Sequence, residues 1–226
     1  MIRSVALALL GVLGTGPASA APTASPAGLV AEGEHYWTTS PDPGNPVACA
    51  TCHHDPGETL GWAASFPKYR ALPPPDGRVM TLLQASAEAV RRHYGLRDPE
   101  RVAVAITAYL TAHGAEVLVA PGLVDGQPVF ETRLHALAAS VARGERFFAQ
   151  GCGNCHAAAT IARATARFPR IVDGRTQSLE GFIAGHRPGR PPVAWDSPPI
   201  ADIIAFLMSH LVGRPVGNVR GAAGLP

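Results

Sequence analysis

Two pentapeptides constrain the fold of this chain more than any other feature. Residues 49–53 (CATCH) and 152–156 (CGNCH) share the pattern C-x-x-C-H. This pattern is the attachment signature of a c-type haem, because the two thiols reach the two vinyl groups on one edge of a porphyrin and the following imidazole binds the iron. We therefore predict two covalently bound haem c groups. The predicted attachment residues are Cys49, Cys52, Cys152 and Cys155, and the predicted proximal ligands are His53 and His156.

Two other uses of paired cysteines fit the sequence less well. A zinc ribbon places its C-x-x-C pairs about 15–20 residues apart, whereas residues 53–151 separate the pairs here. A thioredoxin-like redox pair has no use for the histidine that follows. The sequence has 4 cysteines, and all of them belong to the two motifs, so none remains for a structural disulfide.

The N-terminus has the pattern of a secretory signal peptide. Arg3 precedes an apolar run over residues 5–13, and small residues follow as far as Ala20. We predict a signal peptide over residues 1–20 that is cut near Ala20 and directs the chain to the periplasm. The apolar run is shorter than the roughly 20 residues that span a bilayer, and no later segment is long enough, so we expect no stable membrane insertion.

The two halves of the sequence repeat one another. Each half has a turn with the sequence DGR, a Phe-Pro pair, and similar segments in its first and last predicted helices. The paired segments are 33–36 with 144–147, 66–67 with 168–169, 76–78 with 173–175 and 108–110 with 205–207. Together with the duplicated C-x-x-C-H motif, this pattern indicates an internal duplication of one haem unit.

The spacing of apolar residues and caps predicts helices and long loops. We expect helices near residues 29–37, 79–92 and 134–150, one that opens at Asp98-Pro99-Glu100, and a last one that opens at Ser197-Pro198. The fold class is therefore all-α. Each half resembles a class I cytochrome c domain, a small helical fold around its haem. The resemblance implies two tandem domains, over residues 21–120 and 134–226, joined by a linker over residues 121–133.

The ligand opposite each proximal histidine decides whether a haem only passes electrons or also binds small molecules. His93 and His186 each precede the final helix of their half, and we predict that they fill these positions. Met80 is an alternative to His93. Met208, or an open position, is an alternative to His186, although Met208 has the helical spacing typical of a core residue.

One segment has a closer resemblance to a known group. Residues 177–186 (QSLEGFIAGH), with Phe168-Pro169 and residues 211–216, are similar to the periplasmic dihaem cytochromes of the SoxA and thiosulfate dehydrogenase group. In that group a cysteine seven residues after the leucine ligates the active haem, and this chain has His186 in its place. The resemblance implies a periplasmic redox protein with a histidine-ligated second haem.

These observations favour a periplasmic cytochrome that transfers electrons between a donor and an acceptor redox protein. An enzyme or enzyme subunit of thiosulfate oxidation is an alternative, since residues 143–190 have eight arginines that would attract a sulfur oxyanion. A gas-binding haem protein is another. The net charge of +2 is too near neutral to suggest a nucleic-acid partner.

Overall fold

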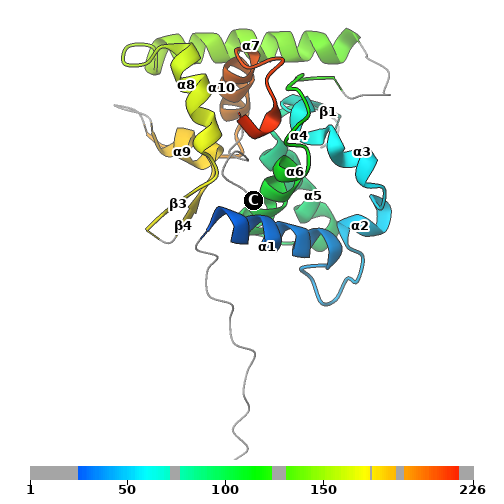
Figure 1. The fold of residues 1–226 in the computed structure, drawn as a ribbon. Helices are drawn as coiled ribbons and strands as arrows, with labels where there is room; N and C mark the ends of the chain where they lie inside the picture. The colour runs from blue at the N-terminus through cyan, green and yellow to red at the C-terminus, as the bar shows by residue number, and fades with distance from the viewer. Residues whose placement is uncertain (1–24, 72–76, 124–130, 174, 187–190, 219–226) are drawn as a thin grey trace, which may run out of the picture.

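The two halves of the protein are built from corresponding elements (Figure 1). The computed structural model describes residues 25–71, 77–123, 131–173, 175–186 and 191–218. The predicted signal peptide lies outside these residues. The first half contains α1 (Pro26–Thr38), α2 (Cys49–Cys52), α3 (Pro56–Leu60), α4 (Trp62–Ser65), β1 (Lys68–Arg70), β2 (Arg78–Met80), α5 (Leu82–Tyr94) and α6 (Glu100–His113). The second contains α7 (Glu131–Gly151), α8 (Ala158–Ala164), the 3-10 helix η1 (Thr165–Arg167), β3 (Arg170–Val172), β4 (Arg175–Gln177), α9 (Leu179–Gly185), α10 (Pro198–Ser209) and the 3-10 helix η2 (Val216–Asn218).

A pair of packed helices holds each half together. Helix α1 packs against α6, and α7 packs against α10. A glycine makes both approaches possible, because a Cβ on Gly33 would overlap the backbone of α6, and one on Gly144 would overlap the backbone of α10. The two glycines occupy equivalent places in the repeated segments 33–36 and 144–147. The duplication seen in the sequence is therefore also present in the packing.

Each half also contains a short antiparallel hairpin. Strand β1 pairs with β2, with Lys68 opposite Met80, and β3 pairs with β4, with Arg170 opposite Gln177. Our prediction of a helix over residues 79–92 is wrong at its start, because its first residues form β2. The helix begins only at Leu82, where the side chain of Thr81 accepts a hydrogen bond from the backbone N–H of Gln84 and caps it.

The all-α fold class is confirmed, since the two strand pairs are short and helices make up most of the described chain. The main core cluster takes residues from both halves, from Trp37 in α1 to Met208 in α10. A smaller cluster joins Val79 of the first hairpin to Leu137 of α7 and Ala205 of α10. The division at residues 120 and 134 remains a prediction, and α7 begins at Glu131, inside the predicted linker.

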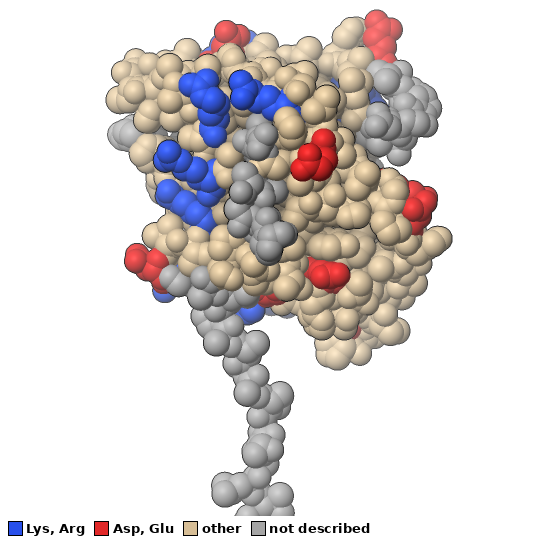
Figure 2. All heavy atoms as spheres, viewed as in Figure 1, with Lys and Arg blue, Asp and Glu red and all other residues tan. Residues whose placement is uncertain are grey.

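Within the described residues, no helix is long and apolar enough to cross a membrane. Charge is spread unevenly over the face in Figure 2, where Lys and Arg side chains gather on the side of α7 and α8 and the acidic side chains lie mainly on the opposite side. Exposed arginines of these two helices include Arg146 and Arg163.

Candidate haem sites

The first C-x-x-C-H motif forms a single helical turn. The turn α2 starts after Ala48, and the backbone N–H of His53 donates to the carbonyl of Cys49 at 3.0 Å. The imidazole of His53 lies near two indoles: its ring centre is 4.9 Å from that of Trp62, edge to face, and 6.1 Å from that of Trp37. Two aromatic side chains from α1 and α4 therefore flank the predicted proximal histidine.

Two cavities that share lining residues lie beside this motif. The smaller, of ≈ 110 Å³, has Cys49, Cys52, His53 and His93 in its wall. The larger, of ≈ 300 Å³, is also lined by His53 and His93, and Met80 lies in its wall. The structure therefore brings His93 and its alternative, Met80, to the same cavity as the first motif.

Hydrogen bonds attach the loop before the motif to the end of α5. The Asn45 side chain donates to the carbonyl of His93 at 2.7 Å, and the Tyr94 hydroxyl donates to the carbonyl of Val47 at 3.1 Å. The same hydroxyl lies 3.9 Å from the sulfur of Cys49. Burial raises the pKa of Tyr94 to about 12, with a smaller contribution from Cys49, so the phenol stays protonated and can donate this bond.

The second motif follows the last turn of α7. The backbone N–H of Cys152 donates to the carbonyl of Phe148 at 2.8 Å, and that of His156 donates to the carbonyl of Cys152 at 3.0 Å. Across from it, the Ser178 side chain caps α9 by accepting from the backbone N–H of Gly181 at 3.0 Å. Helix α9 ends at Gly185, so the next residue, His186, stands at its C-terminal end.

The rings of His156 and His186 lie near each other. Their ring centres are 6.4 Å apart, and the Phe182 ring stacks on His186 with centres 5.0 Å apart and an angle of 11° between the planes. Two imidazoles on opposite sides of one metal ion have ring centres about 6 Å apart, because each metal–nitrogen bond is about 2 Å and the ring centre lies about 1 Å beyond the nitrogen. The observed spacing therefore fits one iron between the two rings.

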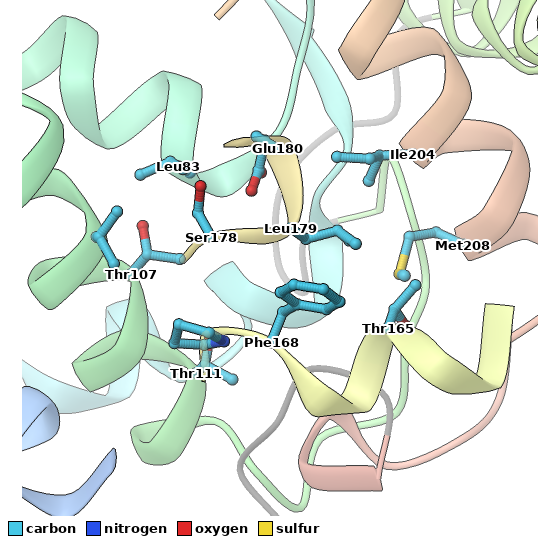
Figure 3. Close-up of a pocket in the computed structure, with 12 residues that line it drawn as sticks. Leu83, Thr107, Thr111, Thr165, Phe168, Ser178, Leu179, Glu180, Ile204 and Met208 are labelled. Carbon is cyan, nitrogen blue, oxygen red and sulfur yellow. The ribbon is translucent and has the colours of Figure 1, made fainter. Parts of the chain in front are cut away.

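Met208, the alternative to His186, lies in the hydrophobic core. It is 1% exposed and belongs to the main hydrophobic cluster. Figure 3 shows its thioether near Thr165 and Ile204, at the edge of a small cavity of ≈ 50 Å³ between α5, α6, α9 and α10. The helical spacing of Met208 in the sequence had indicated this core position.

The sequence reasoning missed a basic group at the first cavity. Lys68, Arg70 and Arg92 line the larger space together with His53 and His93. Lys68 is the one lysine of the sequence, and this rarity could have drawn attention to it. Its place near the first motif, however, follows only from the pairing of β1 with β2.

No protein-family model matches the sequence, and no curated protein is significantly similar to it. The solved structure of SoxXA from P. pantotrophus contains a chain with a similar fold. The TM-score is 0.63 at 18% sequence identity, and the match covers 87% of this chain and 78% of that chain. The likeness supports the cytochrome c-like, all-α fold.

Proposed function

We propose that this chain is a periplasmic dihaem cytochrome c that transfers electrons between redox proteins. The observation that carries the proposal is the 6.4 Å spacing between the ring centres of His156, in the second attachment motif, and His186. The duplicated C-x-x-C-H supplies the thioether bonds, and the similar fold of a chain of SoxXA is compatible with this role. When bound, each haem supplies an iron that cycles between two oxidation states.

The chain's own residues would hold both irons six-coordinate. In the second half, His156 and His186 are the proposed axial pair, and Phe182 fixes the plane of the His186 ring by stacking. In the first half, His53 and His93 are the proposed pair, with Trp62 and Trp37 orienting the His53 ring. Met80, which is 1% exposed, remains the alternative to His93. A filled sixth position favours electron transfer over binding of a gas.

A second candidate is an enzyme, or a subunit of one, that oxidises thiosulfate. The observation that favours it is the fold shared with a chain of SoxXA, combined with the arginine-rich second half. At His186, however, the SoxA group has a cysteine, and an imidazole does not offer a sulfur for the substrate. Turnover of thiosulfate with an artificial electron acceptor would support this candidate, and no turnover would favour the electron carrier.

Axial ligation is tested on holoprotein purified from the periplasm. Low-temperature EPR and the optical response to carbon monoxide should be compared for the parent, His93→Ala, His186→Ala and the control His135→Ala. The side chain of His135 is 74% exposed, and the ring lies near Glu131 on α7. We expect two low-spin signals and no carbon monoxide binding in the parent and the control.

Each ligand variant should lose one low-spin signal and bind carbon monoxide at one haem. An unchanged spectrum in His186→Ala would remove that residue from the iron. If only His93→Ala were unchanged, Met80→Leu would be expected to change the same signal. Carbon monoxide binding by the parent would favour a gas-binding protein over an electron carrier.

A further inference from the structure

The wall of the larger cavity near the first motif carries excess positive charge. Lys68 and Arg70 come from β1 and Arg92 from α5. Among the described residues that line this cavity, Glu88 is the one carboxylate, and it pairs with Arg92 at 2.7 Å. The ammonium of Lys68 donates to the Ser65 hydroxyl at 2.9 Å and lies over the Phe66 ring at 4.5 Å from its centre. Neither of these two partners carries a compensating charge.

The cations of this wall also act on one another. The pKa of Lys68 is lowered to about 8. Burial is the main cause, and the positive charges of Arg70 and Arg133 contribute less. Burial likewise lowers the pKa of Arg70, with Arg133 contributing. Placing like charges together in a partly desolvated wall is unfavourable unless an anion lies between them. The wall is thus suited to a ligand that carries negative charge.

The position of the thiols shows which ligand fits. Cys49 and Cys52 line the smaller cavity, and the basic residues line the larger one. Both cavities are lined by His53 and His93, the proposed ligand pair, so the thiols and the basic residues adjoin the same two imidazoles. A haem joined to the two thiols by its vinyl groups carries its two propionate carboxylates on the opposite edge, and the cations of the larger cavity would be the residues that hold them.

We propose that Lys68 and Arg70 bind the propionate carboxylates of the first haem. This inference rests on the proposed function, since it requires a haem at the first motif. Arginine suits a carboxylate through paired N–H donors, and lysine acts as a compact charge. Both cations stabilise the reduced state of the first haem, because reduction lowers the positive charge of the iron.

Among the described residues of the second half, the residue at the place of Lys68 has other contacts. Arg170 takes the place of Lys68 in the second hairpin, opposite Gln177. Its guanidinium donates to the Gln177 side chain at 2.8 Å and lies 4.9 Å from the ring centres of both Phe168 and Phe182. The effect of Lys68 and Arg70 should therefore be confined to one of the two haems.

The test is a spectroelectrochemical titration of holoprotein at pH 7, with haem counted in the same samples. Lys68→Met and Arg70→Gln should each lower the midpoint potential of one haem by about 59 mV, which corresponds to a tenfold change in its reduction equilibrium. The midpoint potential of the other haem should stay unchanged. Lys68→Arg, which keeps the charge, should stay close to the parent. The control Arg97→Gln removes an exposed cation and should move neither potential by more than about twofold.

Two results would overturn the inference while leaving the proposed function intact. One is a full complement of two haems with both potentials unchanged in Lys68→Met and Arg70→Gln. The other is a potential that shifts when sulfate or thiosulfate is added to the parent but not to Lys68→Met, because the wall would then bind a free anion instead. A chain without haem at the first motif would contradict the proposed function itself.

Discussion

Replacing Gly144 by alanine should weaken the protein at the contact between α7 and α10. In an exposed helix, glycine to alanine gains about 1 kcal/mol from helix propensity alone. Here the new Cβ would overlap the carbonyl oxygen of Asp202 and would lie 2.9 Å from the Cβ of Phe206. Because the overlapping atoms include backbone, α7 must move away from α10. Overpacking typically costs about 1–3 kcal/mol, and an overlap with backbone belongs at the upper end of that range. After the gain of about 1 kcal/mol is subtracted, we expect a net loss of about 2 kcal/mol.

The matched control is Gly151→Ala in the same helix. A Cβ at Gly151 meets nothing within 4 Å, so this variant should be neutral or gain up to about 1 kcal/mol. Urea unfolding of the two holoproteins, followed by far-UV circular dichroism, measures the difference. With an m-value of about 2 kcal/mol/M, an expected gap of 2–3 kcal/mol separates the midpoints by about 1–1.5 M. Equal midpoints would refute the close approach of the two helices.

Two further predictions concern carboxylates. Arg143→Ala should lower the free energy of unfolding by about 2 kcal/mol in urea melts. The reason is that the guanidinium pairs twice with Asp202, at 2.8 Å each, and this carboxylate is 4% exposed. An unchanged urea midpoint would contradict this prediction. Burial raises the pKa of Glu100 above 4.5, helped by the charges of Asp98 and Asp196. A raised carboxyl pKa favours the folded state at low pH, and that contribution is lost as pH rises through the folded value. The Glu100→Gln variant should therefore lose less stability than the parent when the pH rises from 4 to 7, and the difference between the two losses should be less than about 1 kcal/mol. Equal losses in both proteins would contradict this reasoning.

The helices were predictable where local chemistry marks their ends. Ser197 precedes two prolines, and α10 begins at Pro198 as expected. The helix predicted over residues 134–150 occurs as α7, with three more residues at its start and one at its end. The helix expected from residue 98 begins at Glu100, with Pro99 as its N-cap. The ends of an element are the part that local sequence defines least.

The hairpins were not predictable in the same way. Each strand has three residues, which is too short for an alternating pattern to stand out from a loop. Formation of the first hairpin depends on pairing between β1 and β2 and on contacts with α7 and α10 from the other half of the chain. A reading of local sequence has no access to these long-range contacts.

The candidate site divides along the same line. The covalent chemistry follows from spacing along the chain, and the sequence alone predicts it. The approach of His186 to His156 depends on how α9 is placed against the second motif, and the structure supplies that placement. For the first haem, the structure brings both candidates, His93 and Met80, to one cavity wall, and the spectra of the His93→Ala and Met80→Leu variants distinguish them.

The most direct test of the account is the intact mass of the protein purified from the periplasm. We predict the mass of the polypeptide without residues 1–20, increased by two haems that remain attached after denaturation. The mass of the bare polypeptide would contradict the covalent haem sites on which the proposed function depends.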